Sequence, residues 1–236
     1  GVKYYLEFYL TFESEDAEGA FTIRAEELLS ISGITGVPSK TSFIEKLDSR
    51  YMGSYGDLTV TFSDGSTQYS ISTYSQYYYV YSSDGEFYIR YTVTNEEGTE
   101  CSISSYLDPG TYTIIWYWDA DGDWNFDDGE IQSDPVTVEV IALADAEFPE
   151  LTIGSNDFYN TSEVTRHYFY TFTPYELSRY NFQCTENSGS DGYFYVDSVV
   201  YFDEDGNRTV VGGSPYKLTP GTTYYVDICA YNGESE

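Results

Sequence analysis

Apolar and polar residues alternate along most of this chain, and no other feature of the sequence constrains its fold as strongly. Between residues 2 and 12, every second position is Val, Tyr, Leu or Phe. A repeat of two puts successive side chains on opposite faces of a β-strand, so this segment is expected to bury one face. Similar short segments follow, separated by turn sequences rich in Asp, Gly, Ser and Asn. The pattern therefore predicts an all-β protein.

The expected strands fall into two series. They are residues 57–62, 76–81, 87–93, 101–106, 111–118 and 135–141, and then 150–153, 167–172, 180–184, 193–202 and 223–231. The stretches 24–29 and 42–48 have the composition of short helices. The fold predicted is two β-sandwich domains, of immunoglobulin-like or jelly-roll type, with minor short helices. Segment 142–149 interrupts the alternation, so the domains are expected to comprise residues 1–145 and 146–236.

Composition supports the strand prediction and restricts the partners. Aromatic residues make up 19% of the chain and include 28 Tyr, which favours strands. The formal net charge is −30, from 40 acidic and 10 basic residues. Such a surface repels phosphate and anionic lipid, which argues against nucleic acid and membrane partners. It suits divalent cations, neutral polymers or basic proteins, although solubility outside the cell explains it as well.

The chain has the character of an exported fragment. It begins in strand-like sequence without Met or a signal peptide, and no run approaches the roughly 20 apolar residues that span a bilayer. We expect a secreted or cell-surface protein with other modules and no membrane insertion. Cys184 and Cys229 lie on expected strands of the second domain. They either form a disulfide or remain as two buried free thiols, and the sequence leaves both alternatives open. Cys101 has no obvious partner.

Four segments of the second half carry a resemblance to a known family. They read HYFYTFTP at 167–174, YNFQC at 180–184, VVYFDEDGN at 199–207 and LTPGTTYYVDI at 218–228. Through them residues 150–236 resemble bacterial pre-peptidase C-terminal-type domains, which are small jelly-roll sandwiches of secreted enzymes and surface proteins. The resemblance implies export and a sandwich fold. It implies no ligand, because the matching segments are turns and core strands.

Residues 119–130, which we call the acidic loop, read DADGDWNFDDGE and carry the most specific chemistry. Counted from the first Asp, oxygen-bearing side chains occupy positions one, three, five, seven, nine and twelve of an EF-hand calcium loop. These candidate ligands are Asp119, Asp121, Asp123, Asn125, Asp127 and Glu130. Phe126, at the eighth position, is expected to pin the loop to a core. The sixth position, normally Gly, is Trp124, and the flanking elements are strands.

Two interpretations of the acidic loop are open. It is either a structural Ca²⁺ site or a solvated acidic hairpin, and the mutual repulsion of its carboxylates favours a bound cation. The acidic segment 203–207 is expected to be a plain hairpin turn.

All three Trp lie in or next to the acidic loop. Trp116 is expected in the core of a sandwich. Trp118, at a strand end, and Trp124, in a polar loop, are harder to bury and are candidates for stacking on sugar rings.

Tyrosines form a second candidate platform. If Tyr78 and Val80 point inward, four tyrosines of the hairpin 76–93 line up outside. These are Tyr77, Tyr79, Tyr81 and Tyr88. The alternative is that Tyr serves here only as a strand-forming residue whose rings pack on each other.

Catalytic machinery is not evident in the sequence. His167 is the only histidine, which argues against a zinc site or a histidine-based triad, and no Asp/Glu pair stands out. The function predicted is a non-catalytic carbohydrate-binding module. The overall texture resembles polysaccharide-adherence proteins of gut Firmicutes, which implies starch or another α-glucan as ligand. The alternative is a structural spacer or an adhesin that binds a protein partner.

Overall fold

The computed structural model describes residues 29–54, 56–71, 77–82, 85–157, 166–184 and 192–232. In this part of the chain the fold is all-β, and the sandwich-type prediction is confirmed. The only helical elements described are two 3-10 turns, η1 (Ser49–Tyr51) and η2 (Leu143–Asp145). None of these described elements is a helix long and apolar enough to cross a membrane. The strand predicted at 2–12 lies outside the described residues.

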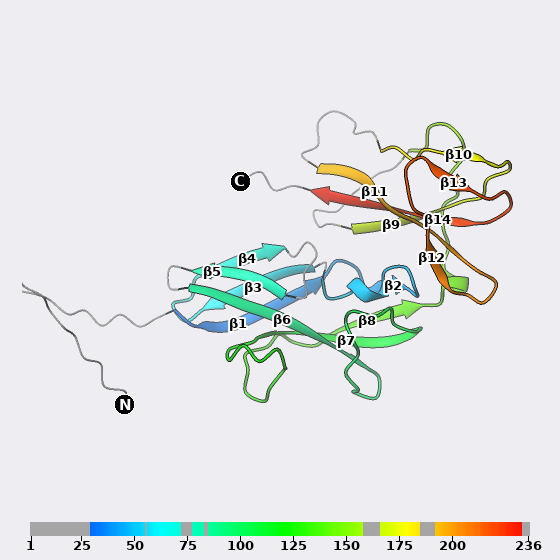
Figure 1. Ribbon diagram of the computed structural model, residues 1–236. Coiled ribbons are helices and arrows are strands. Elements are labelled where there is room, and N and C mark those ends of the chain that lie inside the picture. Colours follow the sequence, from blue (N-terminus) through cyan, green and yellow to red (C-terminus); the bar gives the residue numbers. More distant parts are fainter. Residues whose placement is uncertain are drawn as a thin grey trace, which may run out of the picture.

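The first sandwich consists of two sheets that pack face to face (Figure 1). One sheet has the order β1 (Ile31–Pro38), β3 (Gly56–Phe62) and β4 (Thr67–Ile71). The other has the order β2 (Ser42–Ile44), β8 (Val136–Ile141), β7 (Gly110–Trp118), β6 (Gly85–Asn95) and β5 (Tyr77–Ser82). Strand β2 pairs with β8 in parallel, and the other ladders of this sandwich are antiparallel.

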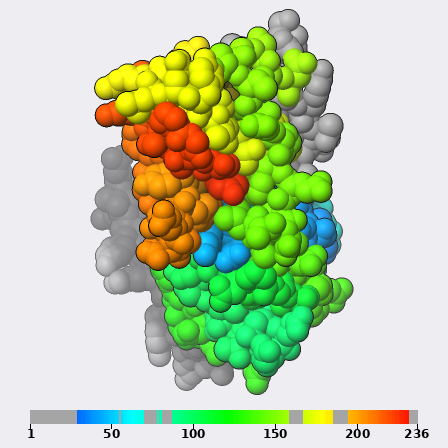
Figure 2. Space-filling view, turned by 90° about the vertical axis from the view of Figure 1, so that its right-hand side faces the viewer, coloured from blue at the N-terminus to red at the C-terminus, as the bar shows by residue number. Residues whose placement is uncertain are grey.

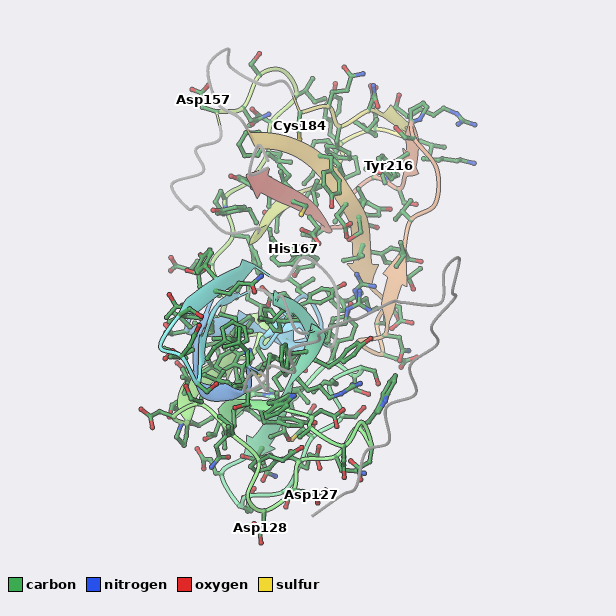
Figure 3. All side chains as sticks on the ribbon, turned by 90° about the vertical axis from the view of Figure 1, so that its left-hand side faces the viewer. Asp127, Asp128, Asp157, His167, Cys184 and Tyr216 are labelled. Atoms are coloured by element: carbon green, nitrogen blue, oxygen red, sulfur yellow. The ribbon has the colours of Figure 1, made fainter. Side chains whose placement is uncertain are left out.

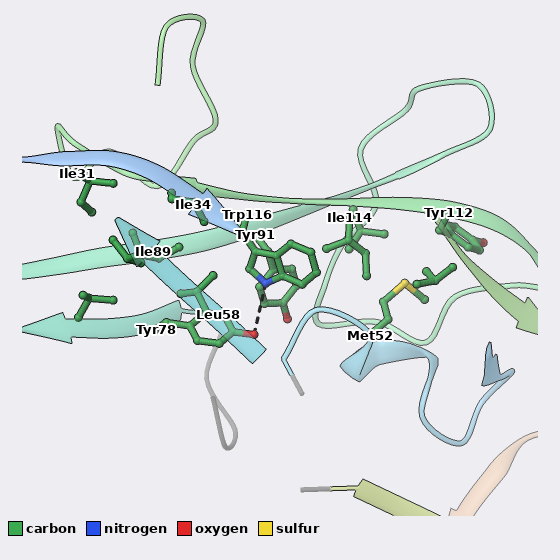
Figure 4. Packing of buried hydrophobic residues seen from close by; sticks show 14 of the residues in the cluster. Ile31, Ile34, Met52, Leu58, Tyr78, Ile89, Tyr91, Tyr112, Ile114 and Trp116 are labelled. Atoms are coloured by element: carbon green, nitrogen blue, oxygen red, sulfur yellow. Dashed lines mark hydrogen bonds between the residues drawn. The ribbon is translucent and has the colours of Figure 1, made fainter. Parts of the chain in front are cut away.

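Trp116 lies at the centre of the first core, between the two sheets (Figure 4). It is 0% exposed, and its Nε1 donates a hydrogen bond of 3.4 Å to the Tyr78 hydroxyl. Opposite it, β1 has Gly36, where an added Cβ would lie 2.2 Å from the indole ring. The glycine is therefore needed for the close approach of the ring, and Trp116 is the core residue that its strand pattern predicts.

The second sandwich has a four-stranded antiparallel sheet covered on one face by a two-stranded ribbon. The sheet has the order β12 (Arg208–Val210), β11 (Gly192–Phe202), β14 (Tyr224–Asn232) and β9 (Arg166–Phe172). The ribbon pairs β10 (Ser178–Tyr180) with β13 (Tyr216–Leu218). A register shift between Val196 and Ser198 makes β11 bulge at Asp197.

The other face of this sheet packs against the first sandwich. Phe169 and Val200 share a buried apolar cluster with Leu47, which follows β2 in the first sandwich. Lys46 Nζ donates a hydrogen bond of 3.3 Å to the carbonyl of Gly206. The space-filling view shows the blue residues of this region wedged between the orange and green parts of the two sandwiches (Figure 2). The two units therefore have an apolar contact and are not separated by solvent.

Several predicted elements differ from the structure. Residues 101–106 are not a strand, and residues 42–48 form β2 and a turn instead of a helix. Residues 150–153 contribute only an isolated bridge at Glu150, and the strand expected at 180–184 ends at Tyr180. Strands β1, β4, β12 and β13 were not predicted. No disulfide joins Cys184 to Cys229 in the part of the chain that the structure describes.

Candidate functional site

The acidic loop leaves the end of β7 and projects at the end of the molecule far from the second sandwich. Figure 3 labels Asp127 and Asp128 at this end, whereas His167 lies near the junction of the two units. The loop is mostly exposed, with Asp119 the exception at 4%. Its first residue is thus anchored in the sheet while the rest reaches into solvent.

The first half of the loop is folded by its own carboxylates. Asp119 Oδ1 accepts from the backbone N–H of Gly122 at 2.9 Å. Asp121 Oδ1 accepts from the N–H of Asp123 at 3.1 Å, and Asp123 Oδ1 from that of Asn125 at 2.8 Å. Hydrogen bonds from the Asn125 side chain and backbone lower the pKa of the Asp123 carboxyl. Repeated Asp-to-backbone bonds of this kind turn the chain around a common centre.

Three carboxylates converge on that centre. One oxygen from each of Asp119, Asp121 and Asp123 lies within 4.8 Å of the other two. The loop is closed from its far end by Glu130, which accepts from Ala120 N–H at 3.2 Å and from Asp127 N–H at 3.1 Å. The arrangement groups hard oxygen donors, which are the ligands that Ca²⁺ prefers.

Arg90, on β6, fixes the base of the loop. Its Nε donates a hydrogen bond of 2.5 Å to Asp119 Oδ2, and both side chains of this ion pair are buried. The same guanidinium lies 3.9 Å from the centre of the Trp124 ring. Buried charges are stable only when paired, and guanidinium groups stack well on indole rings. Arg90 therefore couples the first loop residue to the tryptophan at the loop's sixth position.

Trp124 is held in the loop by an uncommon backbone conformation. Its φ is 74°, in the left-handed region that a non-glycine residue rarely adopts, and Gly122 has a similar φ of 76°. The EF-hand pattern has Gly at this sixth position because the chain turns sharply there. The backbone of Trp124 is strained, and its side chain is 63% exposed. One ring face lies on Arg90, so the opposite face is open to solvent.

Phe126 packs on the outer surface of the same sheet. Its ring centre lies 5.2 Å from that of Tyr117 on β7, which is itself buried. Burial raises the pKa of Tyr117 to about 12, although the positive charge of Arg90 acts in the opposite direction. Phe126 thus attaches the loop to the outer face of the sheet and is 38% exposed, whereas the sequence predicted that it would pin the loop to a core.

Trp118 does not share this surface. It packs edge-on against Phe87, with ring centres 5.7 Å apart, at the margin of the first core. Trp124 instead lies on Arg90, and Arg90 alternates along β6 with core residues such as Ile89. The two predicted sugar-binding tryptophans therefore lie on opposite faces of one sheet and are not brought together.

The structure describes the side chains of only some residues in the predicted tyrosine platform. Tyr78 and Val80 are buried as expected, and Tyr88 is 40% exposed. Tyr88 and Arg90 share one face of β6, next to the loop, because they are two positions apart. The side chains of Tyr77, Tyr79 and Tyr81 lie outside the described part of the structure. Their backbone positions in β5 pair with Arg90, Tyr88 and Glu86, respectively.

A second polar cluster was not foreseen from the sequence. His167 Nδ1 lies 2.8 and 2.9 Å from the two carboxylate oxygens of Asp227, and both residues are buried. Burial raises the pKa of Asp227, which His167 opposes and the charges of Asp197 and Asp48 reinforce. The residues are 60 positions apart and meet through strand register alone.

Comparisons of the chain with protein-family models, curated proteins and solved structures gave no match. The resemblance of residues 150–236 to pre-peptidase C-terminal-type domains therefore stays a prediction. The function must be inferred from the chemistry of the site.

Proposed function

We propose that this protein is a non-catalytic carbohydrate-binding module of a secreted or surface-attached protein, with an α-glucan as the favoured ligand. The observation that carries the proposal is Trp124, an exposed indole ring immobilised on a paired guanidinium. A fixed aromatic ring loses little conformational entropy on binding and offers a flat apolar face to a pyranose. Tyr88 beside it, and the carboxylates around it, supply further contact area and acceptors for sugar hydroxyls.

The first test is retardation in native gels. The protein should be retarded by soluble starch and less by β-glucan or xylan. Trp124→Ala should weaken binding at least about ten-fold, or about 1.4 kcal/mol, because the stacking surface is lost. Tyr175→Ala removes an exposed ring of the second sandwich and is the matched control, with retardation unchanged. Equal mobility of the parent protein with and without all three glycans would exclude the carbohydrate proposal.

Calcium is proposed as a structural ion of the acidic loop. If it binds, saturation at about 100 times the dissociation constant should add about 2.7 kcal/mol of stability, and a chelator should remove it. The readout is the melting temperature with calcium and with chelator. The double variant Asp121→Asn/Asp123→Asn should abolish the response, because both side chains are exposed and serve only the loop. The control variant Asp205→Asn, in the hairpin turn between β11 and β12, should keep the calcium response of the melting temperature. If calcium and chelator leave the melting temperature of the parent protein unchanged, the calcium assignment is refuted.

A spacer or adhesin is the second candidate, and the contact between the two sandwiches favours it. The apolar cluster around Leu47, Phe169 and Val200 joins the units, so the pair suits holding other modules at a set distance. A spacer is expected to show the calcium response without any glycan retardation, which separates it from the first proposal.

A further inference from the structure

His167, Asp197 and Asp227 form a group of metal-ligand side chains that the carbohydrate proposal does not use. One imidazole nitrogen and one oxygen from each carboxylate lie within 4.8 Å of one another. The residues come from β9, β11 and β14, neighbouring strands of the second sandwich. This group lies near the junction of the sandwiches, at a distance from the acidic loop (Figure 3).

Strand register assembles the group. His167 pairs directly with Cys229, so it lies diagonal to Asp227 on the same face of the sheet. Asp197 joins them because it is the extra residue of the β11 bulge between Val196 and Ser198. A bulge redirects a side chain that regular alternation would place elsewhere. Two carboxylates and an imidazole thereby converge on one point.

The imidazole is held in a fixed orientation from the other sandwich. Tyr51, in η1, stacks on His167 with ring centres 5.2 Å apart and planes within 8°. The guanidinium of Arg50 lies 4.5 Å from the centre of the Tyr51 ring. The same guanidinium donates a hydrogen bond to the Tyr51 hydroxyl, so Arg50 helps to hold the Tyr51 ring in place. The carboxylates of Asp197 and Asp48 both act on Asp227 and raise its pKa.

We infer that His167, Asp197 and Asp227 bind a first-row transition-metal ion of the Zn²⁺ class at the junction of the two sandwiches. Imidazole nitrogen with carboxylate oxygen suits zinc, whereas the acidic loop offers only the oxygen donors that suit calcium. Zinc holds such ligands at about 2.0–2.2 Å, so two of them lie at most about 4.4 Å apart. Asp197 is exposed, so its side chain is able to rotate and bring its oxygen to this separation. A water molecule completes the coordination from the solvent side, as in three-ligand zinc sites.

The experiment uses the full chain without a histidine tag, stripped of metal and dialysed against ZnCl₂ in excess CaCl₂, which occupies oxygen-only sites. Bound metal is measured by mass spectrometry, and the imidazole signals are followed by NMR. Because the chain has one histidine, those signals belong to His167 alone. The parent protein should bind one zinc per chain with a large shift of the imidazole signals, and calcium alone should cause none.

Asp197→Asn should weaken zinc binding at least ten-fold while leaving the fold intact, because this side chain is exposed. His167→Gln should have a similar or larger effect. The loop variant Asp121→Asn/Asp123→Asn should retain zinc, so this result is independent of the calcium and carbohydrate proposals. The inference is overturned if the parent protein retains no zinc, if Asp197→Asn binds it equally well, or if the imidazole signals do not move.

Discussion

Replacing Trp116 by Ala should destabilise the protein by about 3–5 kcal/mol, because the ring fills the centre of the first core. For a chain of this size the melting temperature should fall by roughly 6–20 °C. Urea unfolding followed by circular dichroism measures the loss without relying on tryptophan fluorescence. Trp118→Ala, in the same strand, is the matched control and should be milder, since Trp118 is only partly buried. Equal losses in the two variants would contradict the core geometry.

A reciprocal effect is expected at Gly36. Gly36→Ala should destabilise the parent protein, because the new Cβ would lie 2.2 Å from the Trp116 ring. In the Trp116→Ala background the same change should be tolerated, because the cavity left by the indole accepts a methyl group. The double-mutant cycle should therefore give a coupling of about 1–3 kcal/mol, and additive losses would show that the two sites do not touch.

Replacing Arg90 by Ala should cost about 3–5 kcal/mol, because it leaves the Asp119 carboxylate buried without its ion-pair partner. The acidic loop should also lose the attachment of its Trp124 ring to the sheet and become susceptible to a protease that cleaves after acidic residues. Urea denaturation and limited proteolysis are the two measurements. Arg179→Ala removes an exposed arginine of the second sandwich and should change stability by less than about 0.5 kcal/mol.

A second substitution, at Asp119, separates the two contributions of Arg90 to stability, which are its charge and its packing on Trp124. Asp119→Asn, added to Arg90→Ala, should recover part of the lost stability, because a buried amide is less costly than an unpaired carboxylate. Proteolysis of the loop should remain fast, since Trp124 would still lack its guanidinium. If the double variant were less stable than Arg90→Ala, the ion pair would not be the source of the effect.

The sequence was most informative where a pattern is local. Alternation predicted β3, β5, β6, β7 and β8 within a few residues, because a repeat of two directly reports one buried face. The burial of Trp116 followed from its place in that alternation. The ligand spacing of the acidic loop is also local. It anticipated the convergence of Asp119, Asp121 and Asp123, whereas Phe126, expected at a core, packs on the outer face of the sheet.

Prediction failed where distant contacts decide the structure. Residues 42–48 have helical composition, yet β2 pairs with β8 and Asp48 binds Lys40 and the backbone of Ile44. The face on which Trp124 lies depends on how the loop folds back onto Arg90, which spacing does not report, whereas Trp118 shares the face of Trp116 through the alternation of β7. His167 and Asp227 meet only through the register of three strands and a bulge. That two carboxylates lie beside the single histidine was therefore not predictable from the sequence.

The backbone at Trp124 has a consequence for how this loop can change over evolutionary time. A left-handed φ of 74° costs a tryptophan about 1–3 kcal/mol of strain, which glycine would not incur. Selection for stability alone would favour Gly here, which is a single base change from the tryptophan codon and leaves the turn intact. Tryptophan at this position therefore carries a stability cost that glycine would remove. On the proposal that Trp124 binds a glycan, lineages that lose this function should lose the tryptophan before they lose the turn.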